Sequence, residues 1–502
     1  MPGGEWRVST RHSPDAWHAS PVRASARNRQ AYRCICQGKE NLVPRRLFEK
    51  LALALLCTVL VMSGAWGALR GFRPHLPGFH AGVATELTTQ QGDATPSVLG
   101  SNTDDVIKTM QARVRMKPSE GRGYIVLGEA YLQKARETGD PTYYTKAEAV
   151  LKEGVKLEPL NADGITSQGS LALSRHEFRD ALRLGQEAHA LNPYSAVALG
   201  VVGDAQVELG DYPAAIQTFQ AMVDLRPDLS SYARVSYMRE LTGDMQGAIE
   251  AMQQAATSGG PSPENVAWTG WQLGTLYFNT GELDAAQRQY ERALSLVPNY
   301  VHAEAGMAMV AAARGDFPTA IARYTTANSV MPVPAYIAAL GDVYAASGHP
   351  QEAEQQYGLV DAIQKLYQAN GVNSDMEIAL FDADHRRNMQ QAVPLARQAW
   401  RERPSVMGAD ALAWTLYQSG DCQGAAAAQK DALRLGTRLP IMLFHAGMIA
   451  DCVGDASAAK NYLEATVSMN PHFSTLYEGI AQQTLKRITA PSASEEPVKG
   501  HD

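Results

Sequence analysis

The chain has 502 residues, a net charge of −7, and a composition that is 45% hydrophobic but only 7% aromatic. At this length a single hydrophobic core has stopped growing, so either several domains or an elongated repeat array is expected. Residues 101–487 hold 32 lysines and arginines against 43 aspartates and glutamates, and this acidic balance argues against nucleic-acid binding, which needs a basic face.

The N-terminal segment predicts export or membrane anchoring. Residues 1–44 are rich in Arg, Ser, Pro and His without periodicity, which indicates a disordered basic leader or sequence upstream of the true start codon. Residues 51–69 carry no charge and, at ~1.5 Å per residue, would span about 28 Å of the ~30 Å hydrocarbon core of a membrane. We therefore interpret residues 45–69 as either a signal peptide or a signal-anchor transmembrane helix.

The flank of this apolar run also bears on location. Arg45 and Arg46, with Phe48 and Lys50, resemble the twin-arginine export signal in part, although Pro44 and Glu49 depart from it. The alternative is that the two arginines merely flank a signal anchor. In either case the body is expected outside the cytoplasmic membrane, in the periplasm or at the cell surface, and membrane contact through residues 51–69 depends on whether they are cleaved. Residues 70–104 are predicted to be a linker and residues 488–502 a disordered tail.

A recurring 34-residue unit dominates residues 105–487. Pro159, Pro193 and Pro227 lie 34 residues apart, and so do Pro298 and Pro332. The segment that starts at residue 273, LGTLYFNTGELDAAQRQYERALSLVP, resembles the tetratricopeptide-repeat (TPR) pattern, and residues 340–357 and 127–131 resemble it again. The whole is similar to uncharacterised exported or membrane-anchored bacterial TPR proteins. The resemblance implies an all-α, right-handed superhelical solenoid of about ten helix–turn–helix repeats, and residues 472–487 are expected to form a C-terminal capping helix.

Small side chains mark where the helices of each repeat would touch. Most of the ten first helices have Gly, Ala or Ser at the close-approach position. The eighth and ninth depart from this pattern with Leu380 and Trp414, which leaves the packing of these two repeats open. Glycines at the predicted end of the first helix favour a left-handed residue there. These glycines are Gly210, Gly243, Gly281, Gly315, Gly348, Gly420 and Gly454.

The concave face of such a solenoid is lined by first helices, and three adjacent repeats supply a candidate binding surface. Positions 2, 5, 9 and 12 of each repeat should share this face because their spacing follows the helical period. The candidate partner-binding residues are Trp268, Trp271, Thr275, Phe278, His302, Met309 and Asp342. The alternative is that both tryptophans pack into the junction between repeats.

The chemistry of this surface favours an apolar protein or peptide segment as the partner. No repeat carries Lys or Arg at positions 5, 9 or 12, so a clamp for a C-terminal carboxylate is not expected. We therefore predict a non-catalytic interaction scaffold with no cofactor, no metal and no nucleic-acid partner. A self-assembling array is a further alternative, and the oligomeric state is left open.

An enzymatic alternative centres on Asp382, Asp384 and His385, which could form an acid–base or metal site near the turn of the eighth repeat. Aspartate and histidine also serve commonly as helix caps at such turns. Cys422 and Cys452 lie near the turns of adjacent repeats, where a disulfide would suit a chain outside the cytoplasm.

Overall fold

The computed structural model describes residues 102–259 and 263–490, and all the regular structure in these ranges is α-helical. The predicted leader, the 45–69 segment and nearly all of the predicted linker lie outside the described residues, as do residues 491–502. The helices are α3 (Thr103–Met116), α4 (Gly121–Thr138), α5 (Thr142–Leu157), α6 (Ala162–Ser174), α7 (Phe178–Leu191), α8 (Ala196–Glu208), α9 (Tyr212–Leu225), α10 (Leu229–Leu241), α11 (Met245–Thr257), α12 (Pro263–Asn279), α13 (Leu283–Leu296), α14 (Val301–Ala313), α15 (Phe317–Val330), α16 (Pro334–Ala346), α17 (Pro350–Ala369), α18 (Asp375–Asp384), α19 (Met389–Glu402), α20 (Val406–Gln418), α21 (Cys422–Ala432), α22 (Pro440–Cys452), α23 (Ala456–Met469) and α24 (Glu478–Thr489).

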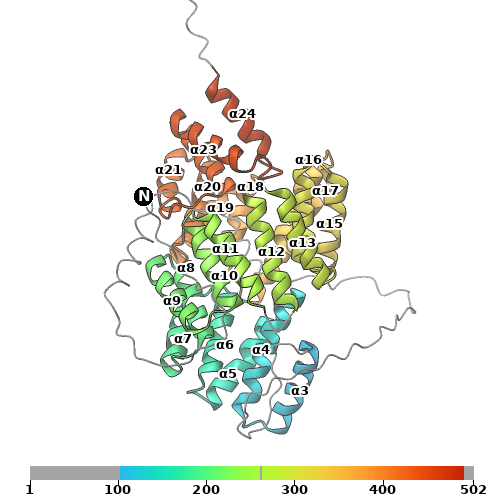
Figure 1. Ribbon diagram of the computed structural model, residues 1–502, viewed down its shortest axis with the longest axis vertical. Helices are drawn as coiled ribbons and strands as arrows, with labels where there is room; N and C mark the ends of the chain where they lie inside the picture. Colours follow the sequence, from blue (N-terminus) through green and yellow to red (C-terminus); the bar gives the residue numbers. More distant parts are fainter. Residues whose placement is uncertain (1–101, 260–262, 491–502) are drawn as a thin grey trace, which may run out of the picture.

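Helices α4 to α23 pair consecutively into ten hairpins, which confirms the predicted all-α solenoid of helix–turn–helix repeats (Figure 1). Helix α3 packs on α4 before the first hairpin, and α24 packs on α23 after the last. The capping helix is shorter than predicted, because it starts at Glu478 rather than at residue 472. Residues 471–477 form turns instead, in which the Ser474 carbonyl accepts the backbone N–H groups of Tyr477 and Glu478.

Glycine in the first helix admits a large side chain from the second. A Cβ added to Gly274 would lie 2.5 Å from the ring of Tyr290, one at Gly341 would lie 2.5 Å from the ring of Tyr357, and one at Gly203 would lie 2.2 Å from the ring of Phe219. Van der Waals contact needs at least ~3.5 Å, so only glycine lets these rings lie flat against the first helix. This pairing explains why the two residue types recur together along the chain.

Substitution of Gly274 by alanine should therefore cost about 1–3 kcal/mol of unfolding free energy, because the methyl group displaces the buried Tyr290 ring. Gly358 in α17 is the matched control, because an added Cβ there meets nothing within 4 Å. Gly358→Ala should be neutral, or stabilise by up to about 1 kcal/mol through helix propensity. Urea denaturation of the two variants measures both effects, and equal midpoints would contradict this packing.

The turn inside each hairpin has the expected geometry. All seven glycines predicted to be left-handed have positive φ, from 76° to 89°. The residue after the glycine then caps the second helix: the carboxylates of Asp211, Asp244 and Asp316 each accept a backbone N–H of the following turn, whereas Glu282 makes no such bond. Short aspartate side chains reach these amides, and capping of this kind stabilises a helix by ~1 kcal/mol.

In the ninth repeat, Trp414 stands at the position where most first helices have a small residue. Trp414 in α20 is 1% exposed, stacks on His445 with ring centroids 4.0 Å apart, and donates its indole N–H to Asp384. The second helix of the same hairpin, α21, carries alanine at four consecutive positions, 425–428. The indole itself packs against α22 and the end of α18.

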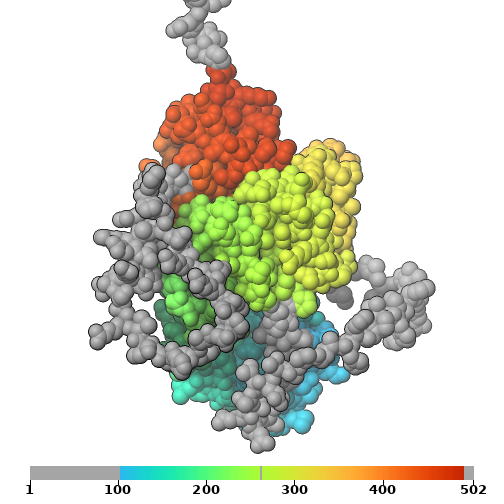
Figure 2. All heavy atoms as spheres, viewed as in Figure 1, coloured from blue at the N-terminus to red at the C-terminus, as the bar shows by residue number. Residues whose placement is uncertain are grey.

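The superhelix closes on itself, because each turn rests on the one before. His176 Nδ1 lies 2.6 Å from the carbonyl oxygen of Asn373, 197 residues later, and Asn470 Nδ2 donates to the Phe278 carbonyl across 192 residues at 2.7 Å. In Figure 2 the orange and red C-terminal repeats lie directly on the green and yellow ones. The predicted concave groove is therefore roofed by later repeats over part of its length.

A buried arginine lies at the centre of this closure. Arg403 Nη2 contacts Glu208 Oε2 at 3.1 Å, although the two residues are 195 apart in sequence, and Arg403 Nη1 contacts Glu377 Oε1 at 3.2 Å. Its guanidinium also lies over the ring of Phe178, 4.7 Å from the centroid. One side chain thus ties α8 and α7 of the first turn to α18 of the next.

Cys422 and Cys452 form a disulfide between adjacent hairpins, with their Cα atoms 5.7 Å apart. Among residues 102–259 and 263–490, no helix has both the length and the apolar character needed to span a bilayer.

Candidate functional site

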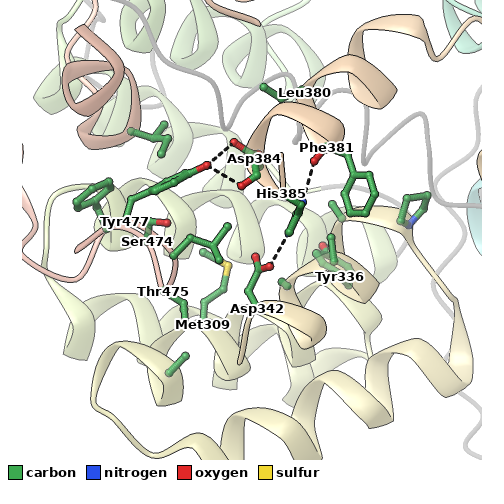
Figure 3. A pocket seen from close by; sticks show the side chains of 18 of the residues that line it. Met309, Tyr336, Asp342, Leu380, Phe381, Asp384, His385, Ser474, Thr475 and Tyr477 are labelled. Carbon is green, nitrogen blue, oxygen red and sulfur yellow. Dashed lines mark hydrogen bonds and ion pairs between the residues drawn. The ribbon is translucent and has the colours of Figure 1, made fainter. Parts of the chain in front are cut away.

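The closed superhelix encloses a cavity of about 590 Å³ on its concave side (Figure 3). First helices α12, α14, α16 and α18 form its wall, and the turn segment 472–477 together with the start of α24 covers it from the C-terminal end. Most of the lining side chains are apolar, among them many alanines from α14 and α16. The size and lining are those of a ligand-binding site rather than of a packing defect.

Five of the seven predicted groove residues line this cavity: Trp271, Thr275, Phe278, Met309 and Asp342. The other two, Trp268 and His302, are not part of the lining. Trp268 is half-buried between two clusters of the core, as expected if it packs into the repeat junction. His302 is 5% exposed and lies behind Trp271, with ring centroids 4.6 Å apart.

His302 supports the wall rather than forming its surface. Its Nδ1 lies 2.8 Å from the hydroxyl of Tyr336, which itself lines the cavity, and burial lowers the pKa of His302 to about 3. The imidazole is therefore neutral at physiological pH and fixes the positions of Trp271 and Tyr336 through stacking and hydrogen bonding.

Acid should destabilise the protein through His302. The unfolded chain binds a proton near pH 6.5 and the folded chain only near pH 3, so this contribution to stability is lost as the pH falls from 6.5 towards 3. At pH 5 the loss amounts to about 2 kcal/mol. Urea denaturation gives the free energy of unfolding at pH 7 and at pH 5. Between these two pH values, His302→Gln should lose about 2 kcal/mol less of this free energy than the parent protein does. His349→Gln, at an exposed position, is the control and should lose as much unfolding free energy as the parent. If His302→Gln also lost as much as the parent, the buried neutral state of His302 would be contradicted.

A polar cluster lies where α16 meets the end of α18. Asp342 Oδ1 accepts the His385 Nε2–H at 2.9 Å and the Tyr357 hydroxyl at 3.0 Å, while His385 Nδ1 lies 2.8 Å from the Phe381 carbonyl oxygen. A carboxylate and a carbonyl are both acceptors, so both ring nitrogens of His385 donate, which is the pattern of the imidazolium cation. Burial opposes that charge, but the hydrogen bond and the charge of Asp342 outweigh burial and raise the pKa of His385.

Asp382, Asp384 and His385, the residues of the enzymatic alternative, do not point into one common site. Asp384 and His385 line the cavity, but Asp382 does not; it accepts a hydrogen bond from Asn388 Nδ2 at 3.1 Å, and burial raises its pKa to about 6. Asp384 Oδ1 accepts bonds from Trp414 and Tyr477, both at 2.9 Å. His385 uses both nitrogens and offers no lone pair to act as a general base. In the part of the chain that the structure describes, no cluster of three or more His, Cys, Asp or Glu side chains could hold a metal ion.

The segment 472–477 is the part of the site that the sequence pattern did not indicate. Phe473 and Tyr477 are buried, Leu476 is half-buried, and all three line the cavity, where Tyr477 reaches across to Asp384 (Figure 3). In the sequence, only the apolar and aromatic character of these residues indicates that they line a cavity. The same character is equally typical of a capping helix.

The repeats also match known proteins. A family model described as "Tetratricopeptide repeat" matches residues 166–230 and 272–328. Tetratricopeptide repeat protein 36 of Mus musculus is 33% identical over 100 residues, which are 20% of this chain and 54% of that protein, and its counterpart from Danio rerio is 28% identical over 108 residues, which are 21% and 58%. The chain therefore spans about half the length of the curated relatives it matches.

Among solved structures, the Cut9–Hcn1 hetero-tetramer of the APC/C is similar over 77% of this chain and 93% of that one, with 13% identity and a TM-score of 0.34. By the family match, residues 166–230 and 272–328 are similar in sequence to tetratricopeptide repeats.

Proposed function

We propose that this chain is a non-catalytic interaction scaffold outside the cytoplasmic membrane, which binds an apolar segment of a protein partner in the cavity. The observation that carries the proposal is the cavity itself: about 590 Å³, lined mainly by apolar side chains from the first helices of several repeats. Tetratricopeptide repeats generally mediate protein–protein contacts, and a concave apolar site with a few polar groups suits a peptide segment.

Two features support the location. The disulfide between Cys422 and Cys452 suits an oxidising compartment, because cytoplasmic thiols are kept reduced. The uncharged run at residues 51–69, which lies outside the described residues, is of the length and composition expected of an export signal or an anchor.

The hydrogen bonds of His385 support a binding role. Both of its ring nitrogens face acceptors, so it has no lone pair with which to act as a general base. Asp384 accepts hydrogen bonds from Trp414 and Tyr477. The polar groups of the cavity are better suited to orient a bound segment.

Site-specific photocrosslinking in intact cells tests this proposal. A benzophenone side chain at Met309, which lines the cavity, should crosslink to a recurring apolar segment identified by mass spectrometry. Met116, which is 79% exposed and lies outside the cavity, is the control position and should not yield that segment. Two outcomes would count against the cavity as the binding site. One is that both positions crosslink equally to the same segment, and the other is that Met309 crosslinks to no segment.

A further inference from the structure

The cavity lining follows α18 from one end of the helix to the other, with polar groups at both ends. Its lining includes Ser374 and Glu377 at the start of α18 and Asp384 and His385 at its end, with Leu380 among the apolar residues between them. At ~1.5 Å per residue the ten residues of α18 extend about 15 Å. An extended peptide of four or five residues covers the same distance, at about 3.3–3.6 Å per residue.

The end near His385 offers a free acceptor. Both hydrogen bonds that Asp342 accepts, from His385 and Tyr357, go to Oδ1, and no donor among the described residues bonds to Oδ2. The Asp342 side chain keeps 18% of its surface exposed, so this oxygen is not sealed in the wall. Figure 3 shows the carboxylate beside Met309, an apolar neighbour that supplies no donor. A carboxylate oxygen without a donor in an apolar site favours a ligand that supplies one.

The other end offers a second unsatisfied group. Ser374 occupies the N-cap position of α18, yet its side chain makes no capping hydrogen bond, and its hydroxyl has no partner among the residues that the structure describes. The residue is 2% exposed and lies in the cavity lining. A buried hydroxyl without a partner is costly, and a backbone amide of a bound segment could satisfy it after a small rotation.

The charge of the wall selects among ligands. The lining contains four carboxylates, Asp342, Glu377, Asp384 and Glu478, and two histidines, but no Lys or Arg. Arg403, which does not line the cavity, neutralises the charge of Glu377 through an ion pair. Even with both histidines protonated, the three remaining carboxylates outnumber the cations, so the wall repels anions and attracts a cation.

From this geometry we propose that the cavity binds an extended apolar peptide of four or five residues whose single lysine places its ammonium group on Asp342 Oδ2. Lysine fits better than arginine because only one oxygen of Asp342 is available, whereas a guanidinium group favours two parallel bonds to both oxygens. The aliphatic stem of lysine packs on the apolar wall, next to Met309 and Ala338. This inference rests on the proposed function and adds to it the chemistry of the bound segment.

Binding of capped synthetic pentapeptides to the parent protein tests the inference. The probes are leucine–alanine pentapeptides with one terminal lysine, and matched versions with norleucine or arginine in its place. The lysine peptide should bind roughly tenfold or more tightly than the norleucine peptide, which is the usual worth of a hydrogen bond to a charged group, and more tightly than the arginine peptide. Titration calorimetry gives each affinity directly.

Two variants locate the effect. Asp342→Asn should remove the preference for lysine over norleucine, whereas Glu478→Gln, which removes one charge from the same wall at a half-exposed position, should keep it. The comparison of peptides on the parent protein stands even if Asp342→Asn does not fold.

The outcomes separate the two proposals. Equal affinity for the lysine and norleucine peptides would overturn the lysine site and leave the apolar cavity as a binding site. Equal affinity for lysine and arginine would overturn the single-oxygen geometry. Binding of neither lysine nor norleucine peptide would overturn the proposed function as well.

Discussion

Replacement of Arg403 by alanine should lower the free energy of unfolding by about 3–5 kcal/mol, the cost typical of removing one partner from a buried ion pair. The Arg403 side chain is 3% exposed, and those of Glu208 and Glu377 are 5% and 18% exposed. The substitution leaves both carboxylates in a site that cannot solvate them. Because Arg403 and Glu377 lie one turn of the superhelix after Glu208, the loss should appear as opening of the closure, with a larger radius of gyration in X-ray scattering.

The pH dependence of this variant has a defined sign. Burial already raises the pKa of Glu208 and brings that of Glu377 to about 7, with Arg403 opposing both shifts. Without Arg403 the two pKa values should rise further. A carboxyl group whose pKa is higher in the folded state than in the unfolded state destabilises the fold as the pH rises towards the folded pKa. The loss of unfolding free energy caused by Arg403→Ala should therefore become smaller as the pH falls from 7 to 5.

Two comparisons isolate the cause. Arg183→Ala removes a side chain that pairs with Asp180 and Glu187 at the exposed surface, and it should change stability by less than about 0.5 kcal/mol. Arg403→Met combined with Glu208→Gln and Glu377→Gln removes every charge of the cluster and should recover much of the loss. A loss below 1 kcal/mol in Arg403→Ala would show that the turns are held together elsewhere.

The repeat itself could be predicted from sequence because its determinants are local and periodic. Gly274 and Tyr290 are 16 residues apart within one hairpin, and the same pair recurs as Gly341 with Tyr357, so the pattern is visible without knowledge of the fold. Left-handed glycines such as Gly243 follow from the stereochemistry of a single turn.

The closure could not be predicted, because Arg403 and Glu208 are 195 residues apart and neither is part of the repeat pattern. How far the superhelix winds depends on the small rotation between adjacent repeats, summed over six or so hairpins, and no single residue encodes it. The sequence therefore predicted an open groove where the structure has a cavity that later repeats partly cover.

Which of the predicted groove residues line the cavity depends on their position in the first helices. Position 9 of the three repeats, occupied by Thr275, Met309 and Asp342, lines the cavity each time. Position 2 does so only at Ala335, whereas Trp268 and His302 pack against neighbouring helices. Trp268 packs against two clusters of the core, and His302 stacks on Trp271, so neighbouring helices cover both large side chains. Only a small residue there leaves the concave surface open.

Filling the cavity should abolish partner binding without harming the fold. Ala338 in α16 lines the cavity and is half-buried, so the indole of Ala338→Trp has space to enter and occupies the volume that a bound segment would need. Loss of about 3 kcal/mol of apolar contact with that segment would weaken capture roughly 100-fold, seen as loss of the Met309 crosslink. The melting temperature should be unchanged or higher, because the indole fills space that is otherwise empty.

Ala322 provides the matched control for this substitution. It lies on the exposed outer face of α15, away from the cavity, so Ala322→Trp adds the same indole to the molecule without entering the site. Capture by Ala322→Trp should equal that of the parent protein. If Ala338→Trp instead captured its partner as well as the parent does, the partner would bind outside the cavity. The cavity would then be a space left between alanine-rich first helices rather than a binding site.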